Sequence, residues 1–434
     1  MRRIRVAGRN CRNILPKTVD SFLGNLELPY NWSSKLKGVV LGICLARSLV
    51  LQDIARKQGG KIKKVEKNLS EFLRCKRLNL RDSSWKCAVE ALRRIGKRRF
   101  YRYRGKLVMV VDSTSYVKMR SRGKEQRMPR IGQVPLHNVP AKGTILVPGY
   151  NEFWTGLLLK DKTCLGITRR LFSEKMLPGL SQNTLEEVEI RRAIDLIQEA
   201  FKTKVIVVAD RGFRRKDLLE LLKKDFGADF VIRIEGKLTI KARGYKGLLQ
   251  DLAPGWPERL RRYWRDNGKN PLFAAVSAAA VMIPLSCRKN LHCNILCLTP
   301  INRGEMAPLF LTSTLPIETL ADLSEIVTLY SRRWTIETFF FSFKQSLGAD
   351  GFRVFSCWEA VDRLLAMAHM AFLILYLMFV LGRKAVRGTW AQFWREVQDQ
   401  LSQWFARPPE LTLGCFFEIM TRDYGGYCWA WNGV

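Results

Sequence analysis

Lys106-Leu-Val-Met-Val-Val-Asp112 sets five consecutive apolar residues between a lysine and an aspartate. A short apolar run rich in valine is typical of a buried strand. Lys204-Val-Ile-Val-Val-Ala-Asp210 repeats the pattern. Between the two runs, residues 185–201 carry apolar side chains at helical spacing. This alternation of strand and helix predicts an α/β core.

Further segments extend the predicted core along the chain. From about residue 229 to residue 320 many segments alternate with period two, which predicts a β-rich insertion. Residues 272–285 fit strand and helix equally. The other predicted elements are strands at 145–147 and 154–159, a helix at 214–224, a long helix at 320–347 and an apolar helix at 360–381.

Residues 1–106 are the most basic part of the chain, with 28 Lys and Arg against 7 Asp and Glu. Their apolar pattern is helical from Leu36 to Ile54, is interrupted at Gly59-Gly60, and resumes over 65–73 and 83–95, where Ser84 is a plausible N-cap. Short helices with basic outer faces predict a helical DNA-binding domain. A solvated basic layer is the alternative, and the sequence does not say which helix would enter a groove.

The whole chain of 434 residues carries 74 Lys and Arg against 39 Asp and Glu, a formal charge of +35. Such a charge calls for a polyanionic partner, with nucleic acid first and an anionic membrane surface second. Residues 364–381 carry no formal charge and reach the length of a membrane span, although a fully buried helix has the same composition. Eleven cysteines without disulfide spacing indicate a reducing, cytoplasmic setting.

A polar stripe lies on the predicted long helix. At about 100° per residue, Tyr330, Arg333, Glu337 and Lys344 project within roughly 60° of one another. The segment is otherwise rich in aromatic residues, so a charged stripe on it indicates the lining of an active-site groove. A surface stripe with ordinary Arg–Glu pairing is the alternative.

These residue types suit phosphodiester chemistry. Three carboxylates from separate elements, Asp112, Asp210 and Glu337, can hold two Mg²⁺ ions, because Mg²⁺ prefers carboxylate oxygens and water. Nearby Arg and Lys side chains can orient the phosphates. The cysteines and histidine at 287–297 do not follow a standard zinc spacing, and the chain contains no Walker-type phosphate loop.

The spacing Tyr-x2-Arg-x3-Glu-x6-Lys, met by Tyr330, Arg333, Glu337 and Lys344, is similar to the signature of bacterial insertion-sequence transposases of the "insertion sequence four" type. These are DDE transposases with an RNase H-like catalytic domain. Asp112 in Val-Val-Asp-Ser-Thr resembles the first aspartate of the family and Asp210 in Ala-Asp-Arg-Gly-Phe the second, with Glu337 as the glutamate. The resemblance covers roughly residues 20–381, and the tail beyond residue 383 matches nothing that we can name.

The resemblance implies a mechanism. Metal-activated water attacks the DNA at the transposon end, and the freed 3′-OH then attacks target DNA or the opposite strand. The cofactor is expected to be two Mg²⁺ ions, with Mn²⁺ as a substitute. Members with such an insertion often form a DNA hairpin and hold a flipped base against a tryptophan, for which Trp256 and Trp264 are candidates. Arg211 joins Tyr330, Arg333 and Lys344 as an expected phosphate ligand.

The predicted organisation combines these features. We expect a bacterial, cytoplasmic, nucleoid-associated homodimer that binds the terminal inverted repeats and target DNA. A catalytically silent DNA-binding relative and a membrane-associated basic protein are the alternatives. The expected domains are a helical DNA-binding domain at 1–105, the RNase H-like core at 106–228 and 321–382, the β-rich insertion at 229–320, and a tail at 383–434 that could serve dimerisation.

Overall fold

The structure is a computed structural model of the chain. Apart from residue 416 and residues 427–429, the tail prediction for 383–434 lies outside the described residues. The described residues are 3–5, 8–26, 28–75, 77–118, 128–135, 145–176, 181–242, 244–264, 272–285, 290–301, 307–354, 356–382, 416 and 427–429.

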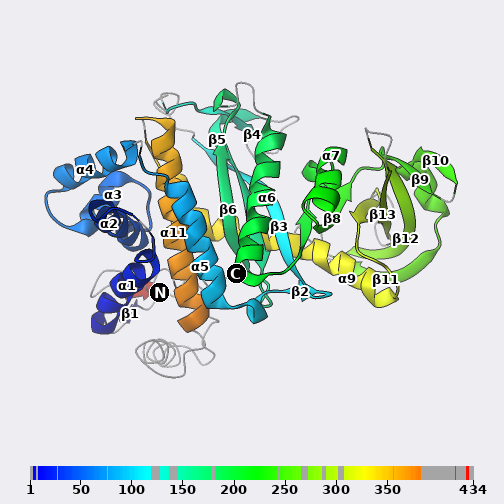
Figure 1. The fold of residues 1–434 in the computed structure, drawn as a ribbon, viewed down its shortest axis with the longest axis horizontal. Helices are drawn as coiled ribbons and strands as arrows, with labels where there is room; N and C mark the ends of the chain where they lie inside the picture. The colour runs from blue at the N-terminus through cyan, green and yellow to red at the C-terminus, as the bar shows by residue number, and fades with distance from the viewer. Residues whose placement is uncertain are drawn as a thin grey trace.

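One large mixed sheet runs through the molecule (Figure 1). Its main path is β10-β9-β12-β13-β14-β8-β7-β3-β5-β4, with β11 on β12, β2 on β3 and β6 on β5. The strands are β2 (Arg102–Tyr103), β3 (Lys106–Val117), β4 (Gly132–Pro135), β5 (Leu146–Leu158), β6 (Cys164–Phe172), β7 (Val205–Ala209), β8 (Asp229–Ile234), β9 (Thr239–Ala242), β10 (Tyr245–Leu248), β11 (Glu258–Trp264), β12 (Leu272–Pro284), β13 (Asn290–Pro300) and β14 (Leu309–Ser313). Separately, β1 (Arg3–Arg5) pairs with β15 (Tyr427–Trp429).

Each of the two apolar runs forms a strand, as predicted, although β3 continues past Asp112 to Val117, and the two strands are neighbours in the sheet. β3 and β7 are parallel, with Val111 opposite Ala209, and β8 continues the parallel set beside β7. The two strands predicted at 145–147 and 154–159 form the single strand β5, antiparallel to β3. The ambiguous segment at 272–285 is a strand, β12, paired along its length with β13.

The N-terminal region is helical. Its helices are α1 (Gly8–Leu23), α2 (Tyr30–Ala46), α3 (Leu51–Gln58), α4 (Ile62–Arg74) and α5 (Leu80–Ile95). The N-cap prediction for Ser84 is wrong, because α5 starts four residues earlier: the Asn79 side chain accepts from the Asp82 N–H at its first turn. Ser84 is fully buried inside the helix and donates to the Arg81 carbonyl.

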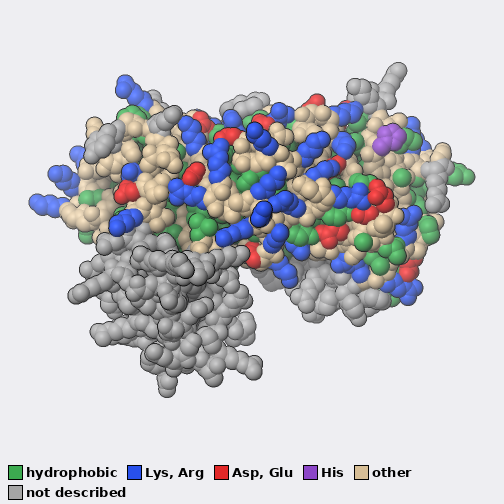
Figure 2. All heavy atoms as spheres, turned by 60° about the horizontal axis from the view of Figure 1, so that its bottom comes forward, with side chains coloured by type: hydrophobic (Ala, Val, Ile, Leu, Met, Phe, Trp, Pro, Cys, Tyr) green, Lys and Arg blue, Asp and Glu red, His purple; other side chains and the backbone are tan. Residues whose placement is uncertain are grey.

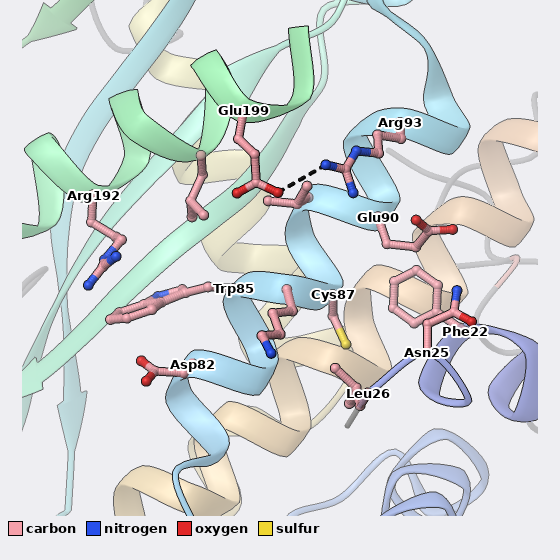
Figure 3. Close-up of a pocket in the computed structure, with 13 residues that line it drawn as sticks. Phe22, Asn25, Leu26, Asp82, Trp85, Cys87, Glu90, Arg93, Arg192 and Glu199 are labelled. Atoms are coloured by element: carbon pink, nitrogen blue, oxygen red, sulfur yellow. Dashed lines mark hydrogen bonds and ion pairs between the residues drawn. The ribbon is translucent and has the colours of Figure 1, made fainter. Parts of the chain in front are cut away.

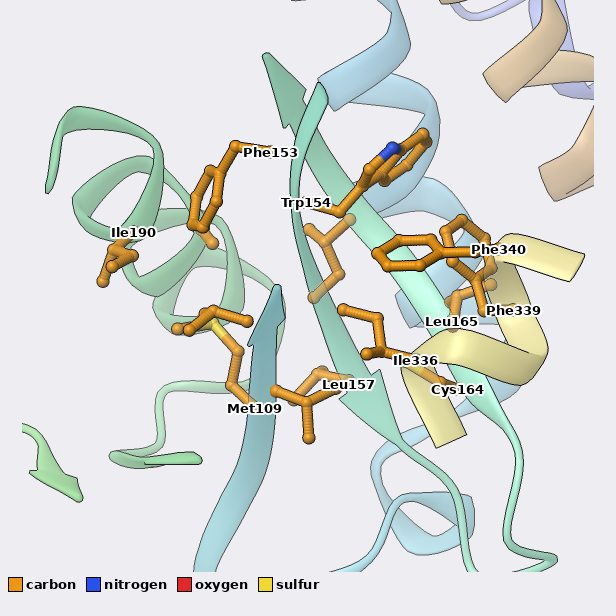
Figure 4. Packing of buried hydrophobic residues seen from close by; sticks show 14 of the residues in the cluster. Met109, Phe153, Trp154, Leu157, Cys164, Leu165, Ile190, Ile336, Phe339 and Phe340 are labelled. Atoms are coloured by element: carbon orange, nitrogen blue, oxygen red, sulfur yellow. The ribbon is translucent and has the colours of Figure 1, made fainter. Parts of the chain in front are cut away.

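Around β5, helices cover both faces of the sheet (Figure 4). The side chains of neighbouring β5 residues point to opposite sides: Phe153 faces Ile190 of α6 (Gln182–Phe201), and Trp154 faces Phe339 of α10 (Thr335–Phe341). α10 packs so closely on β6 that a Cβ added at Gly166 would lie 2.5 Å from the Phe339 ring. This packing fixes the side of the sheet on which the α10 side chains lie.

α11 (Trp358–Gly382) is the central helix and lies beside α5 (Figure 1). It is long and apolar enough to cross a membrane, and 94% of its most apolar stretch of 18 residues is buried inside the protein. His369 in this helix is fully buried and bonds to the Gly166 carbonyl, at 3.1 Å. The structure therefore places the segment at 364–381 in the core.

The long helix predicted over 320–347 is present, and its hydrogen-bond pattern changes in two places. α9 (Leu320–Ser331) is followed by a tighter 3-10 turn at Arg332–Trp334, and α10 is followed by a wider π turn at Ser342–Ser346. The remaining helices are short: α7 (Lys216–Glu220), continued by a π turn at Leu221–Asp225, and α8 (Leu249–Leu252).

Candidate active site

Asp112 and Asp210 lie side by side because of the sheet register. Val111 of β3 is opposite Ala209 of β7, so the next residue on each strand is an aspartate at the same edge. Each carboxylate accepts a backbone hydrogen bond from the following residue, Ser113 N–H at 2.8 Å and Arg211 N–H at 2.7 Å. These bonds orient the two side chains.

Arg333 joins the two aspartates to Glu337. Its guanidinium nitrogens lie 2.9 Å from Asp112 Oδ2, 3.9 Å from Asp210 Oδ2 and 3.5 Å from Glu337 Oε1. The Arg333 side chain is 4% exposed, whereas the carboxylates are 21%, 32% and 33% exposed. The three carboxylates therefore meet around a buried cation, with their other side open to solvent.

Burial is the main influence on the ionisation of two of the three carboxylates. Burial raises the pKa of Asp112 to about 6, against the opposing effect of Arg333. Burial likewise raises the pKa of Glu337 to about 7. For Arg333, burial acts to lower the pKa, but the attraction of Asp112 and Asp210 outweighs it and the pKa rises. An additional cation at this edge would favour the ionised form of both acids.

Tyr330 and Lys344 are the other two residues of the polar stripe predicted on the long helix. The Tyr330 hydroxyl donates to Asp210 Oδ1 at 3.1 Å. Lys344 Nζ donates to Thr114 Oγ1 at 2.6 Å and to the Ser115 carbonyl at 2.7 Å, two to three residues beyond Asp112 on β3. Burial lowers the pKa of Lys344 to about 8. The stripe predicted on one helix face thus spreads along the edge of the sheet, from β7 to the end of β3.

Some predicted residues are not part of this cluster. The Arg211 side chain is exposed beside Asp210, and only its backbone N–H contacts the carboxylate in the described contacts. Trp256 is half-buried and packs against the apolar core, so its ring is partly withdrawn from solvent. The side chain of Trp264 lies outside the described residues.

The sequence reasoning missed Arg233, Thr114 and Ser115. Arg233 of β8 lies 4.0 Å from Asp210. The sheet register explains this contact. Ala209 is opposite Ile232, so the next residues on the two strands, Asp210 and Arg233, lie near each other. Finding it required knowing that β8 is the parallel neighbour of β7. Finding Thr114 and Ser115 required knowing the direction of the Lys344 side chain, which donates to both residues.

The three carboxylates are the kind of ligand that binds a divalent metal. Three carboxylates from separate elements already converge on one cation, and two of them have raised pKa values. Within the described part of the chain, no three His, Cys, Asp or Glu side chains are close enough together to count as a metal-binding group. Arg333 lies between the acids, so a bound ion would share their charge with the guanidinium or displace it.

A separate cavity of about 460 Å³ lies among α1, α5 and α6 (Figure 3). Charged side chains that line the cavity interact with other lining residues. Arg93 pairs with Glu199 at 2.9 Å, and Arg192 stacks over Trp85 at 4.7 Å. Its lining contains none of the carboxylates described above. The cavity marks the junction between the N-terminal helices and the core.

Comparison with known proteins bears on the carboxylate cluster. Residues 186–375 match the family model of the transposase DDE domain. The match supports a DDE transposase family, whose members act on DNA and typically use a divalent metal. The matched segment contains Asp210, Tyr330, Arg333, Glu337 and Lys344, and it begins after Asp112. No curated protein matches the chain.

Proposed function

We propose that the chain is an active DNA transposase that cuts transposon ends and joins them to target DNA. The observation that carries the proposal is the convergence of Asp112, Asp210 and Glu337 around Arg333 at one edge of the sheet. The acids come from β3, the end of β7 and α10, which are far apart in sequence and are brought together by the fold.

Asp112, Asp210 and Glu337 would hold the metal, expected as two Mg²⁺ ions or Mn²⁺ in their place. Metal bound there would lower the pKa of water and stabilise the charge on the leaving oxygen. In hydrolysis, water oxygen bonds to phosphorus, the bond from phosphorus to the 3′ oxygen breaks, and that oxygen takes up a proton. The freed 3′-OH then attacks a second phosphorus by the same exchange of bonds.

The basic and hydroxyl side chains would position the DNA. Lys344 sits at the open edge of β3, where its ammonium can neutralise a phosphate. Tyr330 holds Asp210 in place through its hydroxyl. Arg333 holds the three carboxylates in register, and its position among them also allows it to contact the reacting phosphate when the acids carry metal.

The finer features of the proposal rest on the resemblance in the signature residues. They are membership of the "insertion sequence four" type, an RNase H-like core with a β-rich insertion at 229–320, cut-and-paste transposition with a hairpin intermediate, and a homodimer on paired transposon ends. Trp256 and Trp264 remain the proposed base-stacking residues, and Arg211 a proposed phosphate ligand. The cytoplasm around the nucleoid is the proposed location.

The test is Mg²⁺-dependent nicking of a labelled duplex that carries the element's own end. Wild type should nick it, and Glu337→Gln should bind it without nicking. Glu199→Gln is the matched control, because Glu199 is exposed in a remote pair with Arg93 and should nick as wild type does. Binding without nicking by all three proteins would instead favour the catalytically silent DNA-binding relative.

A further inference from the structure

Helix α3 packs against both α2 and α4. α3 and α4 are separated by three residues, Gly59, Gly60 and Lys61. Both glycines have positive φ, 77° and 83°, a conformation that glycine adopts without a steric penalty. A helix-turn-helix joins two helices that cross at about 90–120° through a turn of three or four residues that often contains glycine, and the α3–α4 turn has this length and composition.

The inner surfaces of these three helices are closely packed. Ile54 and Ala55 of α3 are fully buried, and a Cβ added at Gly42 of α2 would lie 2.8 Å from Ile54. On α4, Leu69 and Leu73 are buried in the same core. α3 is thus a bracing helix with a short exposed surface, and the outer surface of the three helices belongs to α4.

The outer face of α4 is basic and polar. At about 100° per residue its exposed polar side chains span roughly 140° of the helix circumference. They include one acid, Glu71, which lies 4.0 Å from Lys67. The exposed polar residues are Lys63, Lys64, Lys67, Asn68, Glu71 and Arg74, and Ile62 at the first position of the helix is exposed as well.

This face is placed at the end of the molecule. Figure 1 shows α4 at the outer end of the N-terminal helices, and Lys and Arg side chains protrude from the same end in Figure 2. Thirteen residues at 1.5 Å per residue give α4 a length of about 20 Å, enough to lie along a major groove. α3 has eight residues, and its Arg56 is paired with Asp53 at 2.7 Å.

The inner end of α4 is fixed to the catalytic part of the chain. Arg363 of α11, itself buried, donates to the Leu73 carbonyl at 2.6 Å and to the Leu78 carbonyl at 3.1 Å. Leu73 lies in the last turn of α4, so the bond stabilises the helix end. DNA held by α4 would therefore be held at a defined position relative to α11, against which α10 also packs through Phe339 and Phe372.

We propose that α3, the turn Gly59–Lys61 and α4 form a helix-turn-helix whose second helix, α4, reads DNA sequence in the major groove. Asn68 is suited to adenine, because an amide side chain can bond both N6 and N7, and Lys64 is suited to guanine. Lys63 and Arg74, at one edge of the face, contact phosphates. The inference rests on the proposed action on DNA and adds the element that selects the DNA sequence.

The experiment uses the full chain carrying Glu337→Gln, so that bound DNA is not cut. This protein is incubated with a pool of randomised duplexes, and the retained duplexes are sequenced. Asn68→Ala and Lys64→Ala are then introduced separately into the same chain. Lys160→Ala is the matched control, since it removes one exposed lysine from the β5–β6 turn. Asn68, Lys64 and Lys160 are exposed, and thermal melting verifies that each variant is folded.

The expected result is an enriched sequence motif that Lys160→Ala leaves unchanged. Asn68→Ala and Lys64→Ala should each lose the preference at part of the motif, with affinity for it reduced roughly 5- to 100-fold. Affinity of Asn68→Ala for a random duplex should change little. The inference is overturned if both variants enrich the wild-type motif, or if the parent chain enriches none. Neither outcome touches the proposed catalysis, which is tested by nicking with the wild-type chain.

Discussion

Arg333 is the residue on which the acidic cluster depends. It is almost fully buried, and its guanidinium contacts all three carboxylates. Replacing it by glutamine would leave three acids facing one another without their shared cation. We expect Arg333→Gln to lose about 1–3 kcal/mol of stability in metal-free buffer. Thermal and urea denaturation would measure this loss.

The same variant should respond more strongly to metal. If the carboxylates accept Mg²⁺, the ion supplies the positive charge that the variant lacks, so added Mg²⁺ should raise the Tm of Arg333→Gln more than that of wild type. Arg333→Lys keeps one positive charge and should lie between the two. Equal stability of Arg333→Gln and wild type without metal would show that the acids do not need the guanidinium.

At the scale of the element, the helix that carries Glu337 and Lys344 ends against α2. Gly348 has a φ of 69°, and a Cβ there would lie 2.3 Å from the Arg47 carbonyl oxygen. Arg47 in turn donates to the Ser346 carbonyl at 2.8 Å. Gly348→Ala should therefore destabilise the protein by at least about 1–3 kcal/mol.

The matched control for this substitution is Gly351→Ala, three residues away. An added Cβ at Gly351 meets no atom within 4 Å, and its φ is not in the left-handed region. Chemical denaturation of the two variants should separate them clearly. A Gly348→Ala protein as stable as Gly351→Ala would mean that the contact between the helix end and α2 adjusts without strain.

α11 contains a pH-sensitive group. Burial lowers the pKa of His369 to about 3, below the ordinary value of 6.5. Between these values the unfolded chain binds a proton that the folded chain does not, so stability falls as pH falls from about 6.5 towards 3. The loss is on the order of 1 kcal/mol per pH unit. His369→Gln keeps a donor for the Gly166 carbonyl and removes the titration.

Melting curves of wild type and His369→Gln across this pH range would measure the effect. The other titrating groups are common to both proteins, so the difference in stability isolates His369. That difference should shift in favour of His369→Gln as the pH is lowered from 6.5. A difference independent of pH would show that the buried imidazole does not titrate in this way.

The elements themselves illustrate what the sequence predicts and what it does not. Valine-rich runs ending at Asp112 and Asp210 predicted two buried strands, because such runs are too short for a buried helix and are rich in β-branched residues. The long helix predicted over 320–347 is confirmed as continuous helical backbone from Leu320 to Ser346, but the sequence pattern did not predict the 3-10 turn at Arg332–Trp334 or the π turn at Ser342–Ser346 within it. Asn79 rather than Ser84 caps α5, because the Asn79 side chain accepts from the Asp82 N–H whereas Ser84 lies buried within the helix.

Within the site, the sequence supplied residue types and spacing but not partners. It grouped Lys344 with Tyr330, Arg333 and Glu337, yet Lys344 bonds to Thr114 and Ser115. Arg233 was invisible because its place follows from the pairing of β7 with β8. Contacts between strands distant in sequence are set by register, and no local pattern records it.

At the scale of the whole molecule, α11 ties the parts of the chain together. Its apolar length would suit a membrane, but it is enclosed by α1, α2, α4, α5 and the aromatic side of α10. Buried Arg363 bonds it to the end of α4. The basic N-terminal helices therefore pack directly on the core. Their positive charge is held at a fixed position relative to the acidic cluster.

The formal charge of +35 gives the prediction that concerns the entire surface. If Lys and Arg neutralise DNA phosphates, each contact releases counterions, and the logarithm of the binding constant falls linearly with the logarithm of salt concentration. Six or more contacts would lower affinity for a random duplex by about 10³-fold or more between about 50 and 200 mM salt. The Glu337→Gln chain and a fluorescent duplex suffice for this titration. A change of less than about ten-fold would indicate that few phosphates are contacted. Vesicles of anionic lipid provide the comparison. Tighter binding to these vesicles than to DNA at equal salt would indicate that an anionic membrane surface, rather than DNA, is the partner of the basic residues.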